Sequence, residues 1–205
     1  MRDRLQPLHL MSNKKLEINI LYFSNQGREI TFSSILQQKD CLDVEDYEPD
    51  NFWAIMWGFE ITVNRHFTIF HSSDFHYLVR ATSFLLHSMY WIKNEVSDWF
   101  DKDDDFPDDV IVKSTGGNII KLSKQNESEI SFSYANSSED YNNKRGDRFF
   151  ENFVVNKIEW FNEVDLALNE YFIQLLNVID KSNKQNRTIE TMQEYYEVWT
   201  KIRNR

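Results

Sequence analysis

The chain is poor in the residues that most often link, cross-link or break folded units. Its 205 residues include only 5 glycines, 3 prolines and one cysteine, Cys41. Because flexible linkers are built mainly from glycine and small polar residues, this scarcity favours a single compact unit. One cysteine excludes an internal disulfide and argues against a zinc site made of thiolates. The sequence therefore predicts a protein of a reducing compartment, the cytoplasm.

Long apolar runs are missing as well. No stretch approaches the roughly 20 apolar residues that a transmembrane helix needs, and residues 1–11 lack the apolar run of a signal peptide. The net charge is −10. Since binding to nucleic acids and anionic membranes depends largely on neutralising phosphate, we expect neither as a partner. The acidity favours a basic partner, and solubility alone is the plainer explanation.

Aromatic side chains are abundant, at 15% of the chain, which is too many for a disordered protein. The clearest pattern lies in the first half of the sequence. Apolar alternation over residues 53–63 and a return over residues 67–70 predict a hairpin. Side-chain oxygens at residues 72–74 can cap a helix whose apolar positions recur at helical spacing from Phe75 to Ile92. The sequence thus predicts a hairpin that leads into a long amphipathic helix.

Shorter patterns complete the layout. They predict strands around residues 16–22, 30–32, 110–112, 119–122, 130–134 and 149–160, a loop over 136–148, and helices after Asn162 and over 188–203. Turn signals between the first two of these strands, and between the third and the fourth, predict a hairpin at each place. The predicted class is α+β: an antiparallel sheet of about eight strands in meanders, with three main helices packed on it. We expect one domain over residues 1–205. The alternative is two similar halves, residues 15–97 and 109–181, followed by the C-terminal helix.

Carboxylates are concentrated in two connections. The first acidic segment, residues 40–51, has six acids and no base, and the second acidic segment, residues 98–109, has seven acids and one lysine. Aromatic side chains lie among them, which suits capture of a basic protein with aromatics as anchors and charge as steering. The plainer alternative is two solvated loops whose aromatics tuck into the core. The residues that we expect to contact a partner are Asp43, Glu45, Asp46, Tyr47, Glu48, Asp101, Asp103, Asp104, Asp105 and Phe106.

The second acidic segment also begins like a calcium-binding loop, with carboxylates at Asp101, Asp103 and Asp105. The match ends at Phe106, where such a loop needs glycine, and at Val112, where it needs glutamate. An irregular site for a hard cation stays open as an alternative, but we expect no bound metal and no cofactor.

Basic residues gather at two places, before residue 149 and at the C-terminus. They either pair with the acidic segments or leave a dipolar surface, and the sequence does not decide between these arrangements. The residues are Lys144, Arg145, Arg148, Lys201, Arg203 and Arg205.

An enzyme or a small-ligand protein is the alternative functional class. On the predicted central helix, His76, Arg80 and His87 share a polar stripe that could line a cleft. The two histidines would lie about 16 Å apart along the helix axis, too far to share a metal ion. The sequence holds no nucleophile elbow and no phosphate-binding glycine loop, and Cys41 lies among acids, which makes it a poor nucleophile. We therefore expect no catalytic residue.

A third class is a structural or assembly subunit. In that class the high aromatic content would serve a dimer interface instead of a heterologous partner.

The chain resembles small bacterial immunity proteins, cytosolic inhibitors that protect a cell from its own polymorphic or contact-delivered toxins. The resemblance rests on size, acidity, aromatic-rich meanders and the closing run Ile158-Glu159-Trp160-Phe161-Asn162-Glu163 into Ala167-Leu168-Asn169-Glu170-Tyr171. It implies a non-enzymatic protein that binds a toxin domain and occludes its active site. Many such toxins are nucleases with basic grooves, where acidic loops would imitate phosphate.

Overall fold

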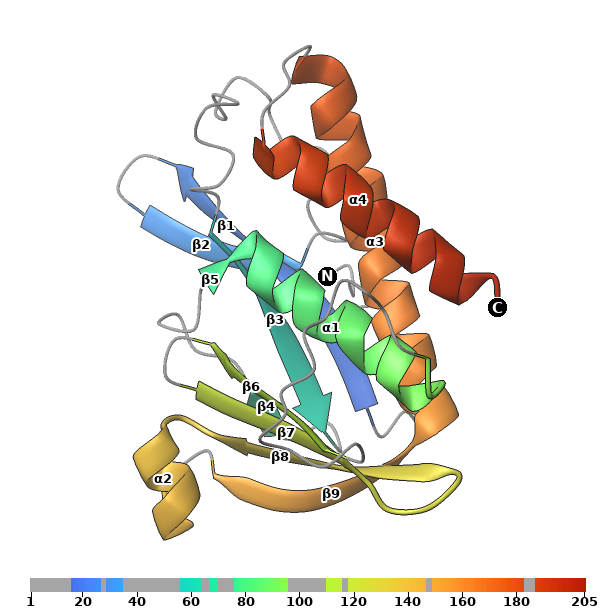
Figure 1. Ribbon diagram of the computed structural model, residues 1–205. Coiled ribbons are helices and arrows are strands. Elements are labelled where there is room, and N and C mark those ends of the chain that lie inside the picture. Colours follow the sequence, from blue (N-terminus) through green and yellow to red (C-terminus); the bar gives the residue numbers. More distant parts are fainter. Residues whose placement is uncertain are drawn as a thin grey trace, which may run out of the picture.

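The computed structural model describes residues 16–26, 29–34, 56–63, 67–69, 76–95, 110–115, 118–146, 149–182 and 187–205. Within these residues the chain forms two antiparallel sheets and four helices (Figure 1). The predicted α+β class is confirmed. The single sheet of about eight strands is wrong.

The first sheet is built around β1 (Leu16–Gln26). One edge of this strand pairs with β2 (Glu29–Ser34), and the other pairs with β3 (Met56–Val63). Two short strands, β4 (Phe67–Ile69) and β5 (His76–Tyr77), both pair with β3. The hairpins predicted for β1–β2 and for β3–β4 are therefore confirmed.

The second sheet follows chain order, β6-β7-β8-β9. Its strands are β6 (Val110–Thr115), β7 (Asn118–Lys124), β8 (Glu129–Ala135) and β9 (Phe150–Asn156). Short turns dictate pairing only between consecutive strands, and a helix and the second acidic segment separate β5 from β6. No tight turn joins the two sets of strands, so turn signals do not decide whether they share one sheet.

Three long helices are present as predicted, with different starting points. They are α1 (Leu78–Ile92), α3 (Lys157–Ser182) and α4 (Arg187–Arg203). The start of α1 at Phe75 is wrong, because His76 and Tyr77 pair with β3 as a strand. The start of α3 after Asn162 is also wrong. Asn156 accepts a hydrogen bond from the backbone N–H of Ile158 and caps the helix there.

A short helix, α2 (Ser138–Asn143), occupies part of the predicted loop. Ser137 is its N-cap: the hydroxyl accepts a hydrogen bond from the N–H of Asp140 and donates one to the carboxylate of the same residue. The hydroxyl thereby satisfies one of the backbone donors that a helix start leaves open. The polar composition of the segment hid this helix.

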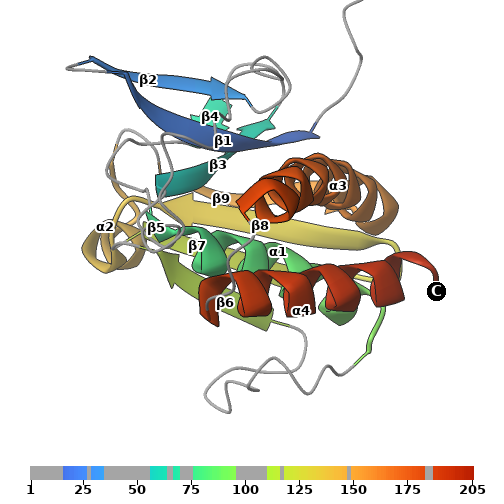
Figure 2. The same cartoon turned by 90° about the horizontal axis from the view of Figure 1, so that it is seen from above.

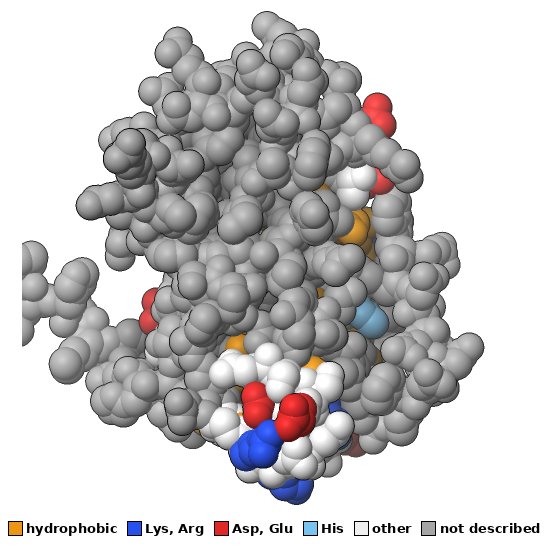
Figure 3. Space-filling model, turned by 90° about the vertical axis from the view of Figure 1, so that its left-hand side faces the viewer, with side chains coloured by type: hydrophobic (Ala, Val, Ile, Leu, Met, Phe, Trp, Pro, Cys, Tyr) orange, Lys and Arg blue, Asp and Glu red, His pale blue; other side chains and the backbone are white. Residues whose placement is uncertain are grey.

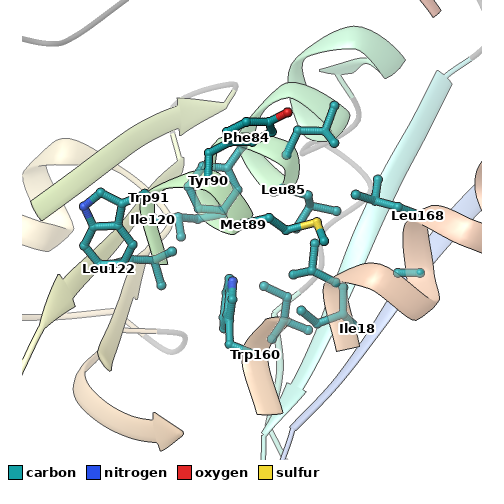
Figure 4. Close-up of a cluster of buried hydrophobic side chains, with 14 of the residues drawn as sticks. Ile18, Phe84, Leu85, Met89, Tyr90, Trp91, Ile120, Leu122, Trp160 and Leu168 are labelled. Carbon is teal, nitrogen blue, oxygen red and sulfur yellow. The ribbon is translucent and has the colours of Figure 1, made fainter. Parts of the chain in front are cut away.

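One buried cluster of apolar side chains includes residues from both sheets and from α1, α3 and α4. Leu85 and Met89 of α1 lie at its centre, facing Ile18 of β1 and Trp160 of α3 (Figure 4). Seen from above, α3 lies between β1 and α4 (Figure 2). Helices α1 and α3 therefore each pack against strands of both sheets.

Buried polar groups in this core have partners. The indole N–H of Trp160 donates to the hydroxyl of Ser88, which in turn donates to the carbonyl of Leu85. The phenol of Tyr90 donates to the carbonyl of Val198 and ties α1 to α4. Such bonds offset the cost of removing polar atoms from water. No helix in the described part of the chain has the length and apolar character needed to cross a membrane.

Candidate functional site

The ten residues predicted to contact a partner, in the first and second acidic segments, lie outside the described residues. The structure does describe the chain that leads into and out of each segment. These flanking residues fix where the segments are attached to the fold.

The first acidic segment lies within the connection from β2 to β3. Ser34, at the end of β2, pairs with Leu21 of β1, and Trp57, near the start of β3, pairs with the next residue, Tyr22. The connection therefore leaves and re-enters the sheet at one level, on either side of β1. Two strand spacings separate these points, about 10 Å. Both attachment points are level with the middle of β1.

The second acidic segment follows the end of α1. Asn94 adopts a left-handed conformation, with φ of 55°, which ends the helix. The ammonium of Lys124 hydrogen-bonds the side-chain oxygen of Asn94, at 2.5 Å, and lies 4.9 Å from the centre of the Trp91 ring. Its neighbour Ser123 pairs with Val110, where the chain re-enters the second sheet. Both ends of this connection are therefore held near Lys124.

Helix α1 joins the two attachment points. β5 pairs with Met56 and Trp57 beside the first acidic segment and leads directly into α1. The 15 residues of α1 span about 22 Å before the chain reaches the second acidic segment. An interface of standard size buries about 800 Å² per partner, which corresponds to a patch about 30 Å across. One partner of ordinary size would thus reach both attachment points.

Four of the six basic residues named above have carboxylate partners outside the acidic segments. At α2, Lys144 pairs with Glu151 at 3.0 Å, and Arg145 pairs with Glu139 and Asp140. Figure 3 shows these opposite charges side by side on one end of the molecule. Exposed pairs of this kind add little stability, but they do neutralise each other's charge.

Basic residues at the C-terminal end of α4 also pair with carboxylates outside the acidic segments. Arg203 lies 3.4 Å from the carboxylate of Asp165, donates a hydrogen bond to Asn169, and stacks over Trp199. Arg205 pairs with Glu95 at the end of α1. Together with the pairs at α2, these contacts favour local ion pairs over pairing with the acidic segments. Arg148 lies outside the described residues.

The alternative cleft of His76, Arg80 and His87 is arranged differently from the prediction. His76 is not on the helix; it lies in β5, opposite Trp57. Arg80 is in the first turn of α1, and His87 is half-buried two turns later. In the described part of the chain, no group of three or more His, Cys, Asp or Glu side chains could hold a metal ion.

Helix α4 approaches the polar stripe of α1 where Ser83 lies, four residues before His87. The phenol of Tyr195 is hydrogen-bonded to Ser83. Burial raises the pKa of Tyr195, the bond to Ser83 partly offsets that shift, and the nearby carboxylate of Glu194 adds to it. This part of the stripe thus serves helix packing.

Sequence reasoning missed a group of exposed apolar side chains. Val154 on β9 and three residues of α3 are between 45% and 70% exposed, and the three are Ile158, Leu166 and Ile173. A helical projection of α3 brings its three residues onto one face, but the strand predicted over residues 149–160 includes Ile158. These are the large apolar side chains that the described part of the molecule presents to solvent.

Comparison with known proteins gives no relative. No protein-family model, no curated protein and no solved structure matches this chain.

Proposed function

We propose that this protein is a non-enzymatic, acidic protein-binding module, an immunity-type inhibitor of a cognate bacterial toxin. It binds through the first and second acidic segments. The partner is a basic toxin domain, whose active site the bound inhibitor occludes without chemistry of its own.

The distribution of charge is the observation that carries this proposal. The two acidic segments hold thirteen carboxylates and one lysine, a net charge of −12. Because the whole chain has a net charge of −10, the residues outside the segments are slightly basic. Lys144, Arg145, Arg203 and Arg205 are paired with carboxylates outside the segments. These four bases therefore do not serve to neutralise the acidic segments.

The attachment of the segments at the two ends of α1 suits this role. Two acidic segments attached about one α1 length apart would steer a basic partner into a defined orientation and raise its association rate. Tyr47 and Phe106 would then serve as the aromatic anchors that dominate binding energy in many interfaces. Because salt screens steering, association should slow as ionic strength rises.

The test is affinity capture of the tagged protein from its source lysate, at low and at high salt, with mass spectrometry of the bound proteins. Wild-type protein should retain one stoichiometric basic partner. The triple variant Asp103→Lys, Asp104→Lys, Asp105→Lys should lose it. A matched control makes the same change of charge at three exposed acids outside the segments, Glu127, Glu190 and Glu197, and should retain the partner.

A second readout separates an inhibitor from other binding proteins. The captured partner should arrest growth when it is expressed alone, and coexpression of this protein should restore growth. A partner that is harmless alone would contradict the immunity-type role. Equal loss of the partner in both triple variants would contradict the role of the acidic segments.

A further inference from the structure

The outward face of α3 carries a regular stripe of side chains. Ile158, Asn162, Leu166, Asn169 and Ile173 follow one another at spacings of four, four, three and four residues. At about 100° per residue they fall within an arc of about 80° on the helix surface. Four of the five are exposed, and Asn169 is half-buried.

The stripe reads the same in both directions along the helix. Around a centre beside Leu166, Ile158 matches Ile173, and Asn162 matches Asn169. If a second copy packs its α3 antiparallel against the first, isoleucine meets isoleucine, asparagine meets asparagine and Leu166 meets Leu166. A two-fold interface requires this kind of self-complementarity, because residue i contacts j and j contacts i.

On one flank of the stripe, opposite charges of the two copies would also meet. Arg203 and Asp165 lie on the α4 side of α3, 3.4 Å apart. In an antiparallel pair the same flank of each helix meets, so Arg203 of one copy comes level with Asp165 of the other. On the opposite flank, Glu159 comes close to Glu170 of the second copy. The first contact is attractive and the second is repulsive, and salt weakens both. Salt also weakens the overall repulsion between two copies that each carry a net charge of −10.

We propose that the outward face of α3 is a homodimer interface with antiparallel helices. The stripe covers 15 residues, about 22 Å of a helix about 10 Å wide, which is well below the about 800 Å² per partner of a stable complex. The dimer is therefore weak. It forms at high protein concentration and becomes tighter as salt rises, unlike the association proposed for the acidic segments.

Cysteine cross-linking tests the pairing residue by residue, in a Cys41→Ser background. Leu166→Cys should cross-link under mild oxidation, because the two residues lie about 1.5 Å apart along the axis. Ile158→Cys should cross-link no faster than Asn143→Cys, an exposed control on α2, because its two copies lie about 22 Å apart along the axis. The double variant Ile158→Cys, Ile173→Cys should cross-link as readily as Leu166→Cys.

Sedimentation equilibrium provides the second arm. Wild-type protein should shift from monomer to dimer mass as its concentration rises, at lower concentration in high salt than in low salt. Leu166→Asp should remain monomeric while keeping the wild-type circular dichroism spectrum. The proposal is overturned if Leu166→Cys cross-links no faster than Asn143→Cys, if Ile158→Cys cross-links as fast as Leu166→Cys, or if Leu166→Asp associates like the wild type. None of these results depends on the toxin partner.

Discussion

Helices α1 and α3 each follow a set of antiparallel strands, yet they are used differently. Most described side chains of α1 are buried, against α3, α4 and strands of both sheets. Helix α3 buries Trp160 and Leu168 on one side and exposes Leu166 and Ile173 on the other. The first helix is a central support of the fold. The second also offers a free face, so the two helices should respond differently to mutation.

The largest effect is expected from truncating a side chain inside α1. Leu85 is fully buried, so Leu85→Ala should lower the free energy of unfolding by about 3 kcal/mol. The matched change on the free face of α3, Leu166→Ala, should alter it by less than about 0.5 kcal/mol. Urea unfolding followed by circular dichroism at micromolar protein concentration measures both. Equal losses in the two variants would contradict the contrast between the helices.

A smaller effect is expected where α3 bonds to α1. Trp160→Phe removes the indole N–H that donates to Ser88 and leaves a smaller ring in a fully buried site. The free energy of unfolding should fall by about 2 kcal/mol. A double-mutant cycle with Ser88→Ala should show a coupling of about 1 kcal/mol between the two side chains. Strict additivity would mean that this hydrogen bond does not help to join the helices.

The smallest effect at neutral pH, and the one that depends on pH, concerns Tyr171. This phenol is fully buried, donates to the sulfur of Met192 and is hydrogen-bonded to Thr82. Burial raises the pKa of Tyr171 above its ordinary value of 10.0, and the bond to Thr82 offsets only part of the shift. The folded protein therefore keeps this proton at alkaline pH, where the unfolded chain loses it.

The stability contributed by Tyr171 is complete below pH 10 and falls as the pH rises above 10. Tyr171→Phe should cost about 1 kcal/mol at pH 7. It should also make the loss of stability between pH 10 and pH 11 shallower than in the wild type. Thermal unfolding over that range measures the slope. Parallel curves for the two proteins would contradict a raised pKa at Tyr171.

Turn signals and helical periodicity predicted much of the local structure, including the β1–β2, β3–β4 and β6–β7 hairpins. They failed where alternation was broken. In β9, Asn152 adopts a left-handed conformation with φ of 58° and donates its N–H to Ser133, and the pairing with β8 shifts register there. A bulge of this kind puts extra residues on one strand. With the alternation broken there, the predicted strand runs past the end of β9 into α3.

One available signal for that boundary was overlooked. Asn156 followed three residues later by Glu159 fits the pattern of a capping box, and Asn156 does cap α3. By contrast, the division into two sheets follows from long-range packing around α1, which no local pattern encodes. The candidate site likewise combines local features that the sequence shows with an arrangement that depends on the fold. The sequence locates the charge of the acidic segments, whereas only the fold shows that they attach at the two ends of one helix.

We propose above all that the first and second acidic segments jointly attract one basic partner. The direct measurement is the rate of association with the captured partner, by stopped flow, as a function of salt. Three charge-reversed proteins would be compared with the wild type. They are Asp43→Lys, Glu45→Lys, Asp46→Lys in the first segment; Asp103→Lys, Asp104→Lys, Asp105→Lys in the second; and the control Glu127→Lys, Glu190→Lys, Glu197→Lys.

We expect both segment variants to associate more slowly than the wild type at low salt, and their association rates to depend less on salt, because each loses part of the steering charge. The control should keep the wild-type salt dependence apart from the small effect of its changed net charge. If all three variants slow association equally, only net charge matters and the claim fails. If only one segment variant differs from the control, the two segments do not act together.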